Sequence, residues 1–212
     1  DQSVRNLRRT CPPLVALAVA LMAMSIAQGG AAELGPDREV IRVAINKSIP
    51  LLEASADFSR SQRSCFTCHH VSSVAITANA AWQRGFKIDK TNLESQLRRT
   101  YSELKGDIER FIGGRFPTGQ GDLLGHSMWL LKEMGWKPDE TTTDTVRFLL
   151  EHDQDSGGWK PEIQRPPTVG NSFTPTFVVL QAIEAFRPPD LGFEIRKRRQ
   201  AAIDWLLQTK SF

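Results

Sequence analysis

The sequence predicts an all-α protein. From Asp37 onward the apolar residues recur at helical spacing, and no segment alternates apolar and polar residues with period two. Stretches rich in Gly and Pro separate the helical segments. The composition, 40% hydrophobic and 24% charged over 212 residues, is that of a globular domain with one sizeable core. It excludes a disordered chain, a collagen and a polytopic membrane protein.

Seven helical segments are expected after residue 37. The first carries an apolar stripe, and Pro50 is expected to end or kink it near its last turn. Gly85 and Gly113-Gly114 are the stop signals of the second and third segments. The expected inward residues are Ile41, Ala44, Ile45, Ile49 and Leu52 in the first segment, Val71, Val74, Ala75, Ala78 and Ala81 in the second, and Leu93, Leu97, Tyr101, Leu104, Ile108 and Phe111 in the third. The other four segments are expected over residues 122–134, 143–151, 174–186 and 194–208.

Residues 1–32 have the order of a secretory signal peptide. Arg5, Arg8 and Arg9 precede an apolar run over residues 12–27, and small residues follow at 29–32. We therefore expect export by the general secretion route, to the periplasm or the cell exterior. The apolar run is short for a spanning helix, which needs about 20 residues. An uncleaved signal anchor, and with it a peripheral association with the membrane, is the alternative.

The charge of the chain does not indicate a nucleic-acid partner. Removing Asp1 and the three arginines of residues 1–32 from the totals of 24 acidic and 27 basic residues leaves 23 and 24, a net charge of +1. A footprint for nucleic acid or acidic lipid needs clustered basic charge. Only residues 196–199, Arg-Lys-Arg-Arg, form such a cluster, and we expect them to make a solvated helix face.

Cys65, Cys68 and His69 have the C-x-x-C-H spacing of covalent haem attachment. Two thiols one helical turn apart can add to the two vinyl groups on one edge of the porphyrin, and the adjacent His69 can then take an axial position on the iron. The predicted export is consistent with this, because haem of this kind is attached after translocation in bacteria. The sequence therefore predicts haem c, with its iron, as the cofactor.

Three other uses of these residues stay open. In an oxidising compartment Cys65 and Cys68 can form a disulfide, since two cysteines remain once Cys11 is removed with the signal. A zinc site can combine them with His69 or His70, although closed zinc sites usually carry a second ligand pair at recognisable spacing. A redox-active C-x-x-C favours a thioredoxin-like βαβ context, which the sequence lacks.

The opposite axial position of the iron has several candidate ligands. His70 is rotated by about 100° from His69 on a helix, so it is not expected to reach the opposite face of the same iron. His126 and Met128 lie on the fourth segment, and His126 is the preferred candidate. An open, five-coordinate iron is the alternative, and it would permit ligand binding or peroxide chemistry. Further candidates are Met134 and His152.

The helical segments repeat. Residues 146–151 resemble residues 203–208, and residues 48–53 are a looser counterpart. Each begins a unit whose partner helix follows a loop, and apolar helix pairs of this kind must stack to bury their faces. We expect one repeat domain over residues 33–212, built as a solenoid or a closed ring. The last unit lacks its partner helix at residue 212, which predicts a C-terminal truncation.

Residues 153–159, Asp-Gln-Asp-Ser-Gly-Gly-Trp after an apolar helix, resemble the QW repeat of the squalene-hopene cyclase and prenyltransferase superfamily. We expect Trp159 to pack across the end of the preceding helix. Residues 201–208 look like the helix that leads into another such repeat, and residues 174–182 like the inner helix that follows one. Residues 64–70 in front of an Ala-rich helix resemble exported bacterial proteins in which C-x-x-C-H-H is embedded in a cyclase-like helical toroid. The resemblance implies an α/α toroid with a c-type haem, and it implies no settled activity.

The favoured function is that of a periplasmic c-type haem protein that exchanges electrons with a redox partner protein. One alternative is a terpenoid-modifying or cyclase-like enzyme. Protonation-driven cyclases that resemble this fold use a D-x-D-D motif, and residues 153–156 lack its final Asp. The sequence therefore assigns no catalytic residue. The other alternative is a non-catalytic binding module, with a C-x-x-C disulfide or metal site, that recognises a partner or a polysaccharide.

Overall fold

The structure is a computed structural model that describes residues 37–62, 68–115, 120–152, 154–155, 157–161 and 170–209. The chain divides between Val43 and Ala44 into two units. Of the first unit only residues 37–43 belong to the described part, and they begin a helix that continues into the second unit. The predicted signal peptide, residues 1–32, lies outside the described residues.

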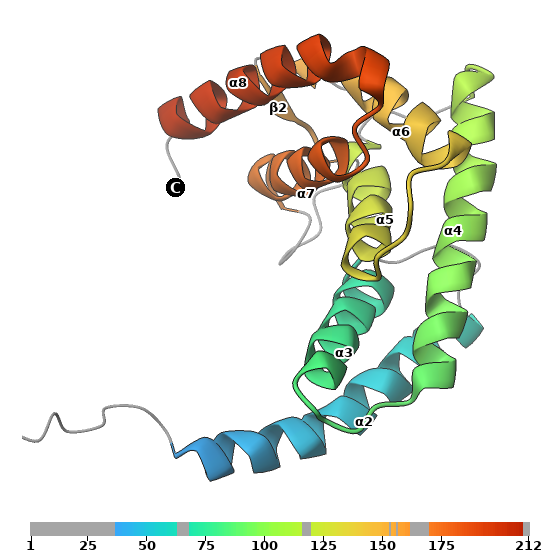
Figure 1. Cartoon of the computed structure of the whole chain (residues 1–212), viewed down its shortest axis with the longest axis vertical. Helices are drawn as coiled ribbons and strands as arrows, with labels where there is room; N and C mark the ends of the chain where they lie inside the picture. Colours follow the sequence, from blue (N-terminus) through green and yellow to red (C-terminus); the bar gives the residue numbers. More distant parts are fainter. Residues whose placement is uncertain are drawn as a thin grey trace, which may run out of the picture. The chain divides into compact units, whose positions relative to one another are not determined.

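Helices form nearly all of the described chain (Figure 1). In chain order they are α2 (Arg38–Gln62), the π-helical turn η1 (Cys68–Ser72), α3 (Ser73–Gln83), α4 (Lys90–Ile112), α5 (Gly121–Glu133), α6 (Glu140–Glu151), α7 (Phe173–Ala185), the short 3-10 helix η2 (Pro189–Leu191) and α8 (Gly192–Gln208). The only strands in this part of the chain are β1 (Gln154–Asp155) and β2 (Gly158–Trp159), an antiparallel pair of two residues each. The prediction of a mostly helical protein is confirmed.

Six of the seven predicted segments match helices whose ends lie within three residues of the predicted ones. The predicted stop signals act where expected, because Gly85 and Gly114 have φ angles of +83° and +78° just after α3 and α4. Residues with a Cβ atom rarely adopt this left-handed conformation, so glycine there ends a helix at little cost. The five residues predicted to face inward between Val71 and Ala81 are all buried.

The helix does not end at Pro50, one of the two expected effects of this residue, since α2 continues past it to Gln62. Proline has no backbone N–H and cannot donate to the carbonyl of Asn46, one turn earlier. Both residues are exposed, so water can hydrate that carbonyl. The missing hydrogen bond therefore costs less here than in a buried helix.

The apolar stripe predicted for α2 is not a core face. Of its five members only Ile49 is buried. Polar contacts join α2 to the start of α4: Asn92 Nδ2 donates to Asp57 Oδ2 at 2.8 Å, and the backbone N–H of Asp89 donates to Glu53 Oε1 at 2.8 Å. The periodicity identified the helix correctly, but the burial of its stripe depends on which elements reach it.

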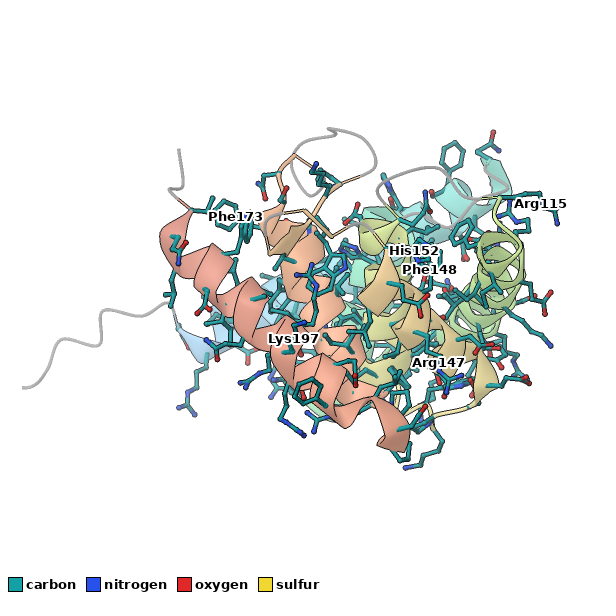
Figure 2. The ribbon with its side chains drawn as sticks, turned by 90° about the horizontal axis from the view of Figure 1, so that it is seen from above. Arg115, Arg147, Phe148, His152, Phe173 and Lys197 are labelled. Carbon is teal, nitrogen blue, oxygen red and sulfur yellow. The ribbon has the colours of Figure 1, made fainter. Side chains whose placement is uncertain are left out.

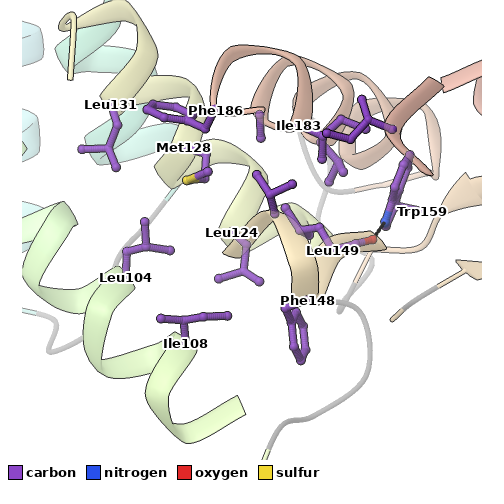
Figure 3. Close-up of a cluster of buried hydrophobic side chains, with 14 of the residues drawn as sticks. Leu104, Ile108, Leu124, Met128, Leu131, Phe148, Leu149, Trp159, Ile183 and Phe186 are labelled. Atoms are coloured by element: carbon purple, nitrogen blue, oxygen red, sulfur yellow. Dashed lines mark hydrogen bonds between the residues drawn. The ribbon is translucent and has the colours of Figure 1, made fainter. Parts of the chain in front are cut away.

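The main core lies where α4, α5, α6 and α7 meet (Figure 3). α5 makes its most extensive contact with α7 and also contacts α3, α4, α6 and η1. Every helix from α4 to α8 contributes a side chain to this core. Its fully or almost fully buried members include Leu104 and Ile108 of α4, Leu124, Met128 and Leu131 of α5, Phe148 and Leu149 of α6, Ile183 of α7, Ile195 of α8, and Trp159 and Phe186.

α5 and α7 approach each other closely at Gly125. A Cβ atom placed on Gly125 would lie 2.6 Å from Val178 Cγ2 and 3.1 Å from the backbone nitrogen of Val179. The first distance is far inside van der Waals contact between carbon atoms. Only glycine therefore permits this crossing, which also fixes the backbone of the next residue, His126.

Trp159 joins three helices, as well as packing across the end of α6 as predicted. Its side chain is fully buried, and Nε1 donates to the carbonyl of Leu149 at 3.0 Å. Its backbone N–H donates to Thr176 Oγ1 of α7 at 2.9 Å. A Cβ atom on Gly121, at the start of α5, would lie 3.2 Å from Trp159 Cβ. The indole thus connects α6 to α5 and α7 with its polar atom hydrogen-bonded.

The prediction of a solvated helix face over residues 196–199 is wrong for Arg198. Arg196, Lys197 and Arg199 are exposed, and Lys197 is labelled on α8 in Figure 2, but Arg198 is only 8% exposed. Its Nη1 and Nη2 donate to the carbonyls of Gly157 and Gly158 at 2.9 and 3.2 Å, and its Cζ lies 3.9 Å from the centroid of the Trp159 ring. Burial lowers the pKa of Arg198 below its ordinary value.

We expect Gly125→Ala to lower the free energy of unfolding by about 1–3 kcal/mol, because the added methyl group forces α5 and α7 apart. Gly106→Ala is the matched control: it adds the same group inside α4, where nothing lies within 4 Å. The control should raise the free energy of unfolding by about 0.5–1 kcal/mol. Urea unfolding followed by circular dichroism measures both. Equal effects of the two substitutions would contradict the close crossing.

Arg198→Met should lower the free energy of unfolding by about 1–3 kcal/mol, because it leaves the carbonyls of Gly157 and Gly158 without their donors but keeps an apolar stem over Trp159. Arg196→Met removes an exposed arginine from the same helix and should change it by no more than about 0.5 kcal/mol. Thermal unfolding of the two variants makes the comparison. If Arg196→Met lowers the free energy of unfolding as much as Arg198→Met does, the contacts of Arg198 do not stabilise the fold.

Candidate functional site

The predicted haem-attachment motif spans the gap between α2 and η1. Cys65 lies outside the described residues, and so do the side chains of Cys68 and His69, whose backbone starts η1. η1 packs against α3 and α5. The backbone that carries Cys68 and His69 is therefore placed beside α5, although α5 follows it by about fifty residues in the chain.

A buried hydrogen bond joins η1 to α5 at His126. Ser72, the last residue of η1, is fully buried, and its Oγ donates to the carbonyl of His126 at 3.0 Å. A buried hydroxyl costs free energy unless it is hydrogen-bonded. This bond therefore fixes the C-terminal end of η1 against the residue that the sequence singled out as the second axial ligand.

The ring of His126 has a defined orientation. Its side chain is 4% exposed, and Nδ1 lies 2.8 Å from the carbonyl oxygen of Asp122 and 3.2 Å from Asp122 Oδ1. Both of these atoms are hydrogen-bond acceptors, so Nδ1 carries the proton and donates it. In the neutral ring, Nε2 then keeps its lone pair, which is the electron pair that a metal ion binds.

Asp122 is a residue of this site that the sequence analysis missed. It lies in the first turn of α5, one turn before His126, and its side chain is 8% exposed. A carboxylate in the first turn of a helix is stabilised by the helix dipole. The signal was present in the sequence as an Asp and a His four residues apart on one predicted helix, a spacing at which side chains are neighbours.

Met128 belongs to the core rather than to this site. It follows His126 by two residues, which places it about 200° around the helix. Its side chain is fully buried in the main cluster, as Figure 3 shows. Met134 packs, partly buried, against a second apolar cluster of Ala75, Ala78, Leu93 and Leu130.

His152 directly follows α6, at its C-terminal cap. Its ring stacks on Phe148 with a centroid distance of 4.2 Å and an interplanar angle of 10°, and Nδ1 lies 3.1 Å from the Phe148 carbonyl (Figure 2). Of the candidates for the second axial position, His126 accepts, through its backbone carbonyl, the described hydrogen bond from Ser72 of η1.

The described residues do not form a metal site or a membrane span by themselves. Within the described ranges, no three His, Cys, Asp or Glu side chains gather closely enough to hold a metal ion. No helix in those ranges is long and apolar enough to cross a membrane.

Comparison with known proteins assigns no family. No family model, no curated protein and no solved structure matches this chain. The function therefore has to be inferred from the motif and from the surroundings of His126.

Proposed function

We propose that this chain is an exported c-type haem protein that transfers electrons in the periplasm or outside the cell. Cys65 and Cys68 would hold the haem through two thioethers, and His69 and His126 would be its axial ligands. The observation that carries the proposal is the hydrogen bond from Ser72 Oγ to the carbonyl of His126, because it joins a buried histidine to the turn that begins with Cys68 and His69, the last two residues of the C-x-x-C-H motif. When bound, the haem would supply an iron that changes between its ferric and ferrous states.

The donor set suits a haem iron. An imidazole with a protonated Nδ1 presents Nε2 as a neutral donor, and histidine is a common axial ligand of haem. His126 and Ser72 are buried, and the apolar Val71 and Val74 next to them are buried as well. Burial lowers the local dielectric, and a low dielectric strengthens the attraction between a charged metal and its ligand.

The proposed scaffold is part of an α/α toroid. Its support is the close crossing of α5 and α7 and the position of Trp159, which joins the end of α6 to α7 in the way expected of a QW-like repeat. The toroid would place the haem on α5, one of its central helices. A redox partner protein would then receive or deliver the electron.

The cysteine motif can be tested directly. The exported protein, produced together with haem-attachment machinery, should keep its haem after denaturation and acid-acetone extraction, because two thioethers hold it. Cys68→Ser should leave one thioether at most, which the pyridine haemochrome spectrum distinguishes from two. A protein without a Soret band, whose mass corresponds to a Cys65–Cys68 disulfide, would favour the binding module instead.

His126→Ala should convert a six-coordinate low-spin spectrum into a high-spin one without releasing the haem, since His69 and both thioethers remain. His126→Gln, which keeps a buried polar side chain, is the second variant in case the alanine destabilises the fold. The control is Met128→Leu, a volume-conserving change in the core that should leave the spectrum unaltered. An unchanged spectrum in both His126 variants would remove His126 as the axial ligand.

A further inference from the structure

The carboxylate of Asp122 is buried without a full set of partners. Its residue is 6% exposed, and within the described part of the chain Oδ1 accepts no hydrogen bond. His126 Nδ1–H lies 3.2 Å from it but makes its hydrogen bond to the Asp122 carbonyl. A buried carboxylate in this state costs stability. Its presence therefore calls for a compensating role.

The geometry fits a role of Asp122 toward the ring of His126. Asp122 and His126 share one face of α5, and the carboxylate lies on the Nδ1 side of the ring, opposite Nε2. Negative charge at this place raises the electron density at Nε2 and stabilises the positive charge that the ring gains when Nε2 binds a cation. Carboxylates that act on a ligating histidine in this way typically change its metal affinity by about 10- to 100-fold.

We infer that Asp122 is the positioning residue of His126: its backbone carbonyl holds the proton on Nδ1, and its carboxylate strengthens Nε2 as a ligand of the haem iron. The inference rests on the proposed function. It goes beyond that function because it assigns the strength of the distal bond to a residue that never touches the iron.

The first readout needs no haem. In protein without haem, labelled with 15N at histidine and measured at about pH 8, above the ordinary pKa of histidine, the proton of His126 should be on Nδ1 and not on Nε2. His126→Gln identifies the resonance. A proton on Nε2 would overturn the inference whether or not the protein binds haem.

The second readout uses the haem protein and free imidazole, which competes with His126 for the iron. Asp122→Asn keeps the shape of the side chain and removes its charge, so imidazole should bind about 10-fold more tightly than to the wild type. Asp190→Asn, which removes an equal charge from an exposed residue paired with Arg147, should not change imidazole binding. Equal imidazole affinities of these two variants would overturn the inference.

A double-mutant cycle separates positioning from a merely structural role. In a His126→Gln background, Asp122→Asn should have no further effect on imidazole binding, because no distal histidine remains to be strengthened. An effect of the same size in both backgrounds would show that Asp122 acts on the fold and not through His126. If no haem attaches at all, the proposed function fails and the ligand role of Asp122 fails with it, whereas the position of the proton on Nδ1 stays measurable.

Discussion

The crossing of α5 and α7 at Gly125 is the constraint on which the rest of the structure depends. A side chain at this position would collide with Val178, so the two helices can touch only because glycine has none. α5 in turn contacts α3, α4, α6 and η1. The distance between α5 and α7 therefore determines how the main core packs. It also constrains the position of His126, which directly follows Gly125 in α5. The crossing at Gly125 thus supports both the main core and the candidate site at His126.

A second constraint acts at the other end of the core, where the loop after α6 returns to α7. Trp159 fills the space between α5, α6 and α7, and Arg198 of α8 covers its ring and donates to two loop carbonyls. A buried guanidinium is costly unless its N–H groups find acceptors, and backbone carbonyls serve here without a carboxylate at hydrogen-bond distance among the described residues. The lowered pKa of Arg198 reflects the same loss of solvation. The arginine thereby connects α8 to the rest of the domain.

The N-terminal half of α5 departs from the pattern of an apolar core. Asp122 and His126 are buried there, next to the buried Ser72 of η1, and a carboxylate oxygen is left without a hydrogen bond within the described chain. Polar groups in such a place lower stability compared with apolar residues of the same size. Natural proteins tolerate this chiefly where a site needs the chemistry. The proposed haem ligand and its carboxylate account for these three residues together, and the apolar remainder of α5 supplies the stability that they cost.

Local sequence patterns predicted the helical class, six of the seven helix positions and the glycine stops, because helical periodicity and stop residues act within a few positions of the chain. They also put forward His126 as a candidate ligand. The sequence also showed the C-x-x-C-H spacing, which is a local feature. The fold, and not the sequence pattern, shows that Arg198 is buried while its neighbours are exposed and that the stripe of α2 is mostly solvated. It also shows that Asp122 and His126 are buried together and that the His126 carbonyl accepts a hydrogen bond from Ser72 of η1. The burial of a side chain and its hydrogen-bond partners depend on which distant elements come into contact. A close helix crossing such as that at Gly125 produces no periodic pattern in the sequence.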